Sequence, residues 1–314
     1  MHWPLLALVA LLSGCAAAPE FNHDVGPAAD GAIDNARDQA AGEDIAPADA
    51  IVGNPDLAPP LADAKVPSPD FGDPNNCKKS PIVCADKVYP QVNGLPNEAP
   101  GSGGCPAGMV KVSTFCIARY EAMLVLDSPS GPAPWSPFQN PGTKTVRALS
   151  VAGAVPQGYI SQLEAKAACS LAKKRLCTDA EWLRACRGAA QRTYPYGNTR
   201  QDGVCNDARK CHPAVQYFES SASWIWGKLD HPCINQLPAG LAKAGAKTGC
   251  VSPDGAFDMM GNLHEWTADP AGTFRGGFYV DTKVNGAGCL YRTTAHSAGY
   301  RDYSTGFRCC ADLP

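Results

Sequence analysis

Apolar residues recur at helical spacing in the middle of the chain. Within residues 161–174, Leu163, Ala167 and Leu171 are four residues apart, which is the spacing of one helix face. The segment is also rich in Ala, Lys and Leu, which favour helices. The sequence therefore predicts a helix over 161–174.

A second helix is predicted over 179–187. Thr178 and Glu181 have the spacing of a capping box, and Gly188 follows as a stop. Short strands are predicted at 109–112, 115–120, 274–279 and 306–309. The rest of the chain lacks periodicity. The pattern indicates an irregular, loop-rich α+β domain, a class that usually needs disulfides or metal ions for stability.

The cysteines change this picture most. The 314-residue chain contains 15 of them, and no two form a C-x-x-C pair. Zinc sites favour close spacing, whereas wide spacing favours disulfides in an oxidising compartment. Most cytosolic enzymes are therefore excluded. A bond between the adjacent Cys309 and Cys310 would be strained, so we expect each to pair elsewhere.

Residues 1–14 have the organisation of a signal peptide. The apolar run at 5–12 is too short to span a bilayer, which takes about 20 residues. The segment LSGC at 12–15 resembles the lipobox of bacterial lipoproteins, in which the cysteine is acylated. Lipidation of Cys15 would anchor the protein to a membrane of the bacterial envelope and leave an even number of cysteines. The alternative is a plain secretory peptide cut after residues 16–18.

Charge divides the remaining chain into two parts. Residues 15–76 carry 12 acidic and two basic side chains, whereas 77–314 have a net charge of +7. Such one-sided charge with few aromatic residues predicts a disordered acidic tether rich in Ala, Pro and Asp; the alternative is a binding tail. Residues 77–104 contain Cys77 and Cys84 and are predicted to be a disulfide-pinned lead-in to a domain at 105–314.

Six segments between about 105 and 311 occur in the order of a known family. They are FCIARYE (115–121), KRLCTDAEW continuing to ACRG (174–188), YPYGN (194–198), DMMGNLHEW (258–266), RGG (275–277) and GFRC (306–309). Together they resemble the formylglycine-generating-enzyme, or sulfatase-modifying-factor, family. The resemblance implies one domain related to the C-type lectin fold, with little regular secondary structure and paired N- and C-terminal strands.

The same resemblance bears on catalysis. Catalytic members oxidise a sulfatase cysteine to formylglycine with oxygen and a copper ion held by two cysteines, which suits the soft Cu(I) ion. The matching positions here are Asp281 and Gly288, the latter beside Cys289. One thiol cannot form that site, so we expect no copper. Cys289 would be catalytic only in a different enzyme, and the alternative is a half-cystine. The family's serine and tryptophan positions hold Phe278 and His264.

A structural calcium ion is also implied by the resemblance. The implied ligands are the side chains of Asp258 and Glu265, the backbone carbonyls of Gly261 and Leu263, and in a second loop Asn206 and Asp207. Oxygen ligands on flexible loops suit Ca²⁺. The alternative is a metal-free turn in which Glu265 pairs with an arginine.

One disulfide follows from the resemblance. It places Cys169 on the first helix and Cys309 on the last strand, at positions that are bridged in some relatives. The usual partner position of Cys186 is Thr293 here, so its bridge must differ, and we take Cys205 as the partner. The other pairings are left open by the sequence.

Trp224 and Trp226, beside Lys228, are candidates for an aromatic surface that binds a sugar or a peptide; the alternative is that they belong to the core. We therefore expect a membrane-anchored bacterial envelope lipoprotein with a non-catalytic domain that binds a glycan or a protein. The alternatives are a formylglycine-generating-type oxidase and a purely structural envelope protein. An exported domain without a recognition motif is not expected to bind nucleic acid.

Overall fold

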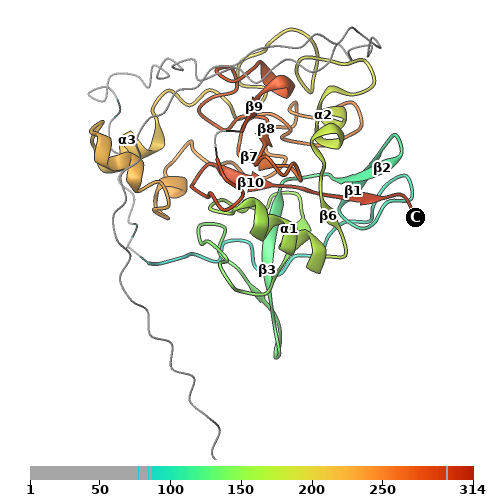
Figure 1. Ribbon diagram of the computed structural model, residues 1–314, viewed down its shortest axis with the longest axis horizontal. Coiled ribbons are helices and arrows are strands. Elements are labelled where there is room, and N and C mark those ends of the chain that lie inside the picture. Colours follow the sequence, from blue (N-terminus) through green and yellow to red (C-terminus); the bar gives the residue numbers. More distant parts are fainter. Residues whose placement is uncertain (1–76, 78–83, 85–86, 295) are drawn as a thin grey trace, which may run out of the picture. The chain divides into compact units, whose positions relative to one another are not determined.

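The computed structural model describes residues 77, 84, 87–294 and 296–314, all within the compact unit formed by residues 61–314 (Figure 1). The helices are α1 (Gln162–Leu171), α2 (Asp179–Arg187) and α3 (Pro213–Phe218), with 3-10 turns η2 (Ser223–Gly227), η3 (Ile234–Gln236) and η4 (Gly288–Leu290). The strands are β1 (Met109–Val112), β2 (Phe115–Ala118), β3 (Ala122–Ser128), β4 (Gly131–Pro134), β5 (Val146–Ser150), β6 (Arg175–Leu176), β7 (His264–Trp266), β8 (Phe274–Arg275), β9 (Arg292–Thr293), β10 (Thr305–Phe307) and β11 (Cys309–Asp312).

The N-terminal predictions fall outside this region. The signal peptide, Cys15 and the acidic tether all lie among residues that the structure does not describe. None of the described helices is long and apolar enough to cross a bilayer. Lipidation, anchoring and the domain boundaries therefore stay predictions.

The first sheet joins the two ends of the domain. β1 and β2 form an antiparallel hairpin, and β11 pairs with β2 so that Cys310 lies opposite Ile117. β6 pairs with β11 on its other edge, giving the order β1-β2-β11-β6. Figure 1 shows β2 beside the C-terminus of the chain. The terminal strands are paired, as the resemblance implied.

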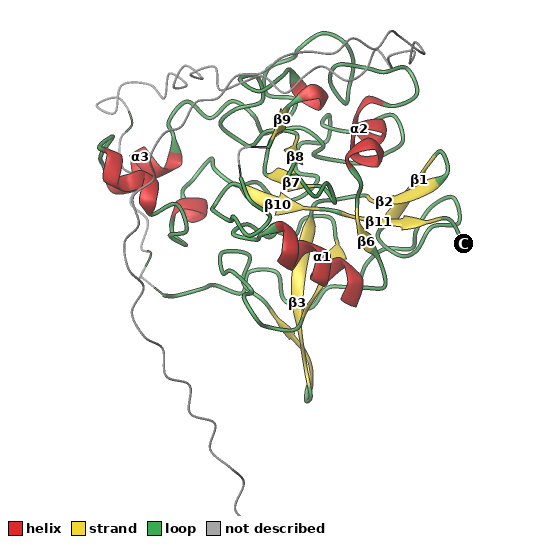
Figure 2. Ribbon diagram, viewed as in Figure 1, coloured by secondary structure: helices red, strands yellow, loops and turns green. Residues whose placement is uncertain are grey.

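Two further small sheets complete the strands. One has the order β10-β7-β8-β9 and the other β4-β3-β5. The strand predicted at 274–279 ends at Arg275, because Gly276 and Gly277 adopt φ angles of 83° and 68° that turn the chain away. Figure 2 shows few helices, short strands and much loop. The α+β, loop-rich class predicted from the sequence is confirmed.

Helix α1 begins with a capping box at Ser161 but buries an unexpected face. The Ser161 hydroxyl accepts the backbone N–H of Glu164, whose carboxylate accepts the N–H of Ser161. The buried face consists mostly of small side chains such as Cys169, and α1 packs against β5. Leu163 and Leu171, whose spacing predicted the helix, are 61% and 46% exposed. The helix is present, three residues shorter than predicted at its C-terminal end, but those leucines lie on its solvent side.

Helix α2 agrees with its sequence signals in full. The Thr178 hydroxyl accepts the N–H of Glu181, and the Glu181 carboxylate accepts the N–H of Thr178. Gly188 ends the helix with a φ of 65°. Trp182, on the first turn after the cap, is fully buried. The capping box thus fixes where the indole enters the core.

Every cysteine in the described ranges is part of a disulfide. The seven bridges are Cys77–Cys211, Cys84–Cys233, Cys105–Cys116, Cys169–Cys309, Cys177–Cys310, Cys186–Cys289 and Cys205–Cys250. The adjacent cysteines near the C-terminus pair with different partners, as expected. Cys77 and Cys84 both connect to the segment that contains α3 and η2.

One predicted pairing is confirmed and one is wrong. Cys169 on α1 pairs with Cys309 on β11. Cys186 does not pair with Cys205: it bonds Cys289, and Cys205 bonds Cys250. The reason is positional, because η4 lies beside α2 and places Cys289 against the helix.

Candidate functional site

The positions that match the copper cysteines hold no free thiol. Cys289 is buried on η4 and bonded to Cys186. The Asp281 carboxylate accepts the backbone N–H groups of Lys283 and Val284, so it caps its own turn. Since all cysteines in the described part of the chain are disulfide-bonded, no pair of thiolates there can hold Cu(I). The residues present do not fit the family's copper site.

The position that matches the family's tryptophan is a histidine packed among rings. The His264 ring centroid lies 4.6 Å from that of Phe274, 4.8 Å from Phe278 and 5.4 Å from Tyr291. Burial lowers the pKa of His264 to about 3, so the ring is neutral at physiological pH. Its Nδ1 has no hydrogen-bond partner among the described residues. We interpret His264 as part of an aromatic packing cluster in which Phe278 replaces the family's serine.

The carboxylate predicted to bind calcium is used in a buried ion pair. Glu265 accepts two hydrogen bonds from the Arg308 guanidinium and one of 2.7 Å from the Trp182 indole N–H. The side chains of Glu265 and Arg308 are 1% and 0% exposed. Arg308 also donates to the backbone carbonyls of Ala118, at 3.0 Å, and Phe257, at 2.9 Å. This is the pairing of Glu265 with an arginine that the alternative to the calcium site predicted.

Two further acids share this buried cluster. Glu121 accepts hydrogen bonds from the Asn262 side-chain amide and from the backbone N–H of Leu263. Burial raises the pKa of Asp258 to about 6 and that of Glu121 well above its ordinary range, and repulsion from Glu265 adds to both shifts. Because the Glu265 carboxylate is bound to the Arg308 guanidinium, its oxygens are not open to Ca²⁺ in this arrangement. The calcium site therefore stays a prediction.

The second predicted calcium loop meets the first at Gly261. Asn206 and Gly261 form an isolated β-bridge, and Gly261 has a φ of 76° where a Cβ would collide with the Asn206 carbonyl. One oxygen of Asp207 accepts from Arg200 and Thr282, and Oδ1 has no partner among the described residues. A single open carboxylate oxygen falls short of the six to eight that Ca²⁺ takes, as a general rule. Nor do the described residues contain a group of three or more His, Cys, Asp or Glu side chains placed to hold a metal.

Sequence reasoning missed two members of this cluster. Glu121 ends the first matching segment and Arg308 lies within the last, GFRC, so the resemblance included both without assigning them roles. Arg308 is 43 residues from Glu265, and no local pattern marks such a pair. The sequence did offer one relevant alternative, in which Glu265 pairs with an arginine. A buried carboxylate needs such a partner, and this requirement could have pointed to Arg308.

The two predicted surface tryptophans are exposed. Trp224 and Trp226 on η2 are 48% and 38% exposed, so the core alternative is wrong for them. The Lys228 Nζ lies 5.0 Å from the Trp224 ring centroid, and Phe218 packs edge-on against Trp224. The His212 ring centroid lies 4.9 Å from that of Trp226. We call Trp224, Trp226 and Lys228 the tryptophan surface.

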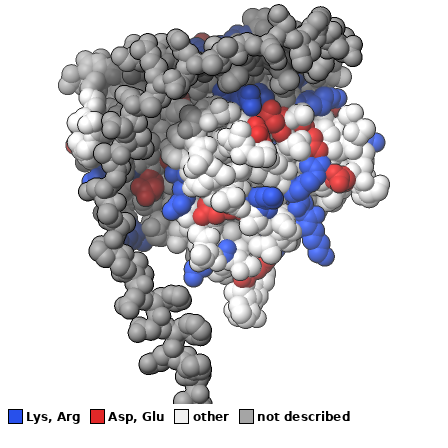
Figure 3. Space-filling model, viewed as in Figure 1, with Lys and Arg blue, Asp and Glu red and all other residues white. Residues whose placement is uncertain are grey.

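Charges of both signs are mixed on the molecule. On the face in Figure 3, Lys and Arg side chains lie among Asp and Glu side chains. Several form ion pairs, including Arg175 with Glu181 and Asp312, and Arg184 with Asp254. Such pairs are typical of a solvated surface. A Lys or Arg side chain that lacks a carboxylate partner is therefore the better candidate for binding an acidic ligand.

Comparison with known proteins places the domain. Residues 106–313 match the sulfatase-modifying factor enzyme 1-like domain. The formylglycine-generating enzyme of Bos taurus is 32% identical over 184 residues, which cover 50% of this chain and 44% of that protein. The protein of Mus musculus named inactive C-alpha-formylglycine-generating enzyme 2 is 28% identical over 168 residues, covering 50% and 49%. The chain spans about half the length of these curated relatives.

Among solved structures, PvdO from Pseudomonas aeruginosa matches with a TM-score of 0.39 and 15% identity, covering 63% of this chain and 80% of that one. The domain match over residues 106–313 includes all six segments identified in the sequence and more than half of the chain. This chain belongs to the FGE-sulfatase family, whose domain is described as sulfatase-modifying factor enzyme 1-like.

Proposed function

We propose that the domain is a non-catalytic ligand-binding module that acts outside the cytoplasm. The observation that carries the proposal is the Cys186–Cys289 bridge, which closes the one cysteine near the family's copper position. Asp281 occupies the other position and offers no thiol. Seven disulfides also require an oxidising compartment, which supports export. Lipidation of Cys15 would then hold the module at the bacterial envelope.

The proposal predicts the result of a direct activity assay. Full-length protein incubated with Cu(I), oxygen and a cysteine-containing sulfatase peptide is expected to leave the peptide mass unchanged, because a two-thiolate copper site cannot form. A catalytic formylglycine-generating enzyme, tested in parallel, provides the positive control. Copper-dependent conversion of the peptide cysteine to formylglycine would establish the oxidase alternative. The sequence identity to a formylglycine-generating enzyme is the reason to test this alternative.

The ligand surface in this proposal is the tryptophan surface. Exposed indole rings stack against the C–H faces of sugars, and burial of each apolar ring on binding is favourable. The segment that carries η2 is fixed to the lead-in by Cys84–Cys233 and Cys77–Cys211. Two disulfides therefore hold the segment that carries the indole rings in place, which suits the binding of a glycan.

Replacing both tryptophans is expected to remove glycan binding. The probe is purified peptidoglycan sacculi in a sedimentation assay, and Trp224→Ala with Trp226→Ala should weaken binding by about tenfold or more. The matched control replaces Leu163 and Leu171, which are also exposed, and should leave binding unchanged. If both variants lost binding equally, or if binding were undiminished without the tryptophans, the tryptophan surface would not be the ligand-binding surface. Failure of the parent protein to sediment would favour a protein ligand.

A further inference from the structure

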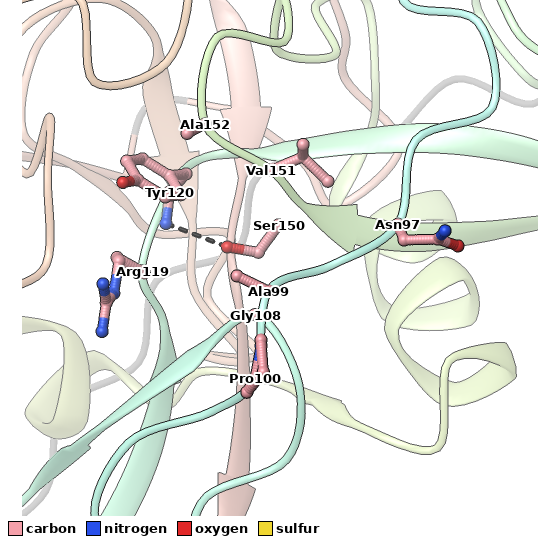
Figure 4. A pocket seen from close by; sticks show the side chains of 9 residues that line it. All are labelled: Asn97, Ala99, Pro100, Gly108, Arg119, Tyr120, Ser150, Val151 and Ala152. Carbon is pink, nitrogen blue, oxygen red and sulfur yellow. Dashed lines mark hydrogen bonds between the residues drawn. The ribbon is translucent and has the colours of Figure 1, made fainter.

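A pocket of about 240 Å³ opens where the lead-in meets the start of the domain. Its lining residues are Asn97, Ala99, Pro100, Gly108, Arg119, Tyr120, Ser150, Val151 and Ala152. Figure 4 shows Arg119 and Tyr120 on one side and Asn97 on the other, with Ser150 between them. At roughly 30 Å³ per water in the liquid, the volume corresponds to a ligand of about one sugar residue. None of these residues was singled out from the sequence for a site.

The walls of the pocket are held by main-chain hydrogen bonds. Gly108 donates to the carbonyl of Ala99, and Arg119 donates to the carbonyl of Gly108, each at 2.8 Å. The backbone N–H of Tyr120 donates to the Ser150 hydroxyl at 3.0 Å. Gly108 also lies inside the loop closed by Cys105–Cys116. The pocket is therefore preformed, which lowers the entropic cost of binding.

Arg119 provides the charge of the pocket. No carboxylate among the described residues forms an ion pair with it, and its guanidinium makes only a 3.5 Å contact with the Ser102 hydroxyl. The nearby Glu98 cannot serve, because it is bound to Lys174 at 2.6 Å and accepts the N–H of Ser150. A guanidinium without a carboxylate partner at the wall of a pocket is suited to bind the planar carboxylate of a ligand.

The other walls match a sugar ring. The Tyr120 ring is stacked on Phe257 with centroids 5.2 Å apart, and a Cβ at Gly245 would collide with it, so the ring is firmly packed. An aromatic wall receives the C–H face of a sugar. The Ser150 hydroxyl, which accepts the N–H of Tyr120, can donate its own hydrogen to a ring hydroxyl.

We propose that this pocket binds a hexuronate residue, with Arg119 holding the carboxylate, Tyr120 facing the ring and Ser150 contacting a hydroxyl. The net charge of +7 on residues 77–314 favours the approach of an acidic glycan. The site uses different residues from the tryptophan surface. The test of this pocket is therefore independent of the test of the tryptophan surface.

The test uses sodium glucuronate as the probe, with glucose as the neutral control. NMR titration or calorimetry on the disulfide-intact, full-length protein is expected to show millimolar binding of glucuronate and at least tenfold weaker binding of glucose. Arg119→Gln is expected to weaken glucuronate binding by about tenfold or more. Arg301→Gln removes the same charge from an exposed arginine outside the pocket and should leave binding unchanged.

A second variant guards against an effect on folding. Asn97 is exposed and makes no side-chain hydrogen bond among the described residues, so Asn97→Asp should fold normally while adding a repelling negative charge at the rim of the pocket, on the other side of Ser150 from Arg119. It should weaken glucuronate binding and leave the unfolding midpoint unchanged. No binding of glucuronate at millimolar concentration, equal binding of glucose, or unaltered binding in both pocket variants would overturn the proposal.

Discussion

Replacement of Arg308 with methionine is expected to lower the free energy of unfolding by about 3–5 kcal/mol, because it leaves the buried Glu265 carboxylate without its counter-charge. Glu121 and Asp258 lie close by and would add repulsion. Methionine preserves apolar volume, so the loss reports the charge rather than a cavity. Denaturant unfolding with the disulfides intact provides the measurement. The loss should shrink at acidic pH, where Asp258 and Glu121, whose pKa values are raised by burial, are protonated and repel Glu265 less.

Arg175→Met is the matched control. Arg175 pairs with Glu181 and Asp312, but its side chain is 37% exposed and that of Asp312 is 86% exposed. Solvent screens such pairs, so a loss of about 1 kcal/mol or less is expected. Similar losses at Arg308 and Arg175 would contradict the view that the buried cluster organises the domain.

Removal of the Cys186–Cys289 bridge by serine at both positions is expected to cost about 3–4 kcal/mol. The bonded residues are 103 positions apart, so the bridge restricts the unfolded chain over a long loop. Other bridges, such as Cys177–Cys310 and Cys205–Cys250, shorten that loop, which places the expected loss below that of an isolated loop of the same length. Unfolding midpoints and slopes of the parent and the variant provide the measurement.

The control is the Cys105–Cys116 bridge, which spans only 11 positions. Its removal is expected to cost about 1 kcal/mol less, because a short loop loses less freedom when it is closed. If removal of Cys186–Cys289 left stability unchanged while the short bridge mattered, its role as a structural staple would be wrong.

Local signals predicted the helices because their energetics are local. The capping box of Thr178 and Glu181 contains both partners within four residues, and α2 begins where it indicates. The spacing of Leu163 and Leu171 predicted α1 but on the wrong face. The core packs against the small side chains of α1, and periodicity of large residues cannot show that preference.

Features that depend on distant segments were not predictable in the same way. Cys289 lies four residues before the position from which the partner of Cys186 was sought, and only the placement of η4 beside α2 reveals the bridge. The pocket at Arg119 also needs four separate segments. In contrast, Asp281 and the lone Cys289 indicated the missing copper site from the sequence, because the identity of a ligand is a local property.

The most direct test of the central claim is a count of alkylatable thiols in the full-length protein, denatured without reductant and analysed by mass spectrometry. Because Cys186–Cys289 closes the cysteine nearest the copper position and the other cysteines are also bridged, we expect no alkylation at any of the 14 cysteines from Cys77 to Cys310. Alkylation of Cys289 in the native protein, together with stoichiometric bound copper, would contradict it.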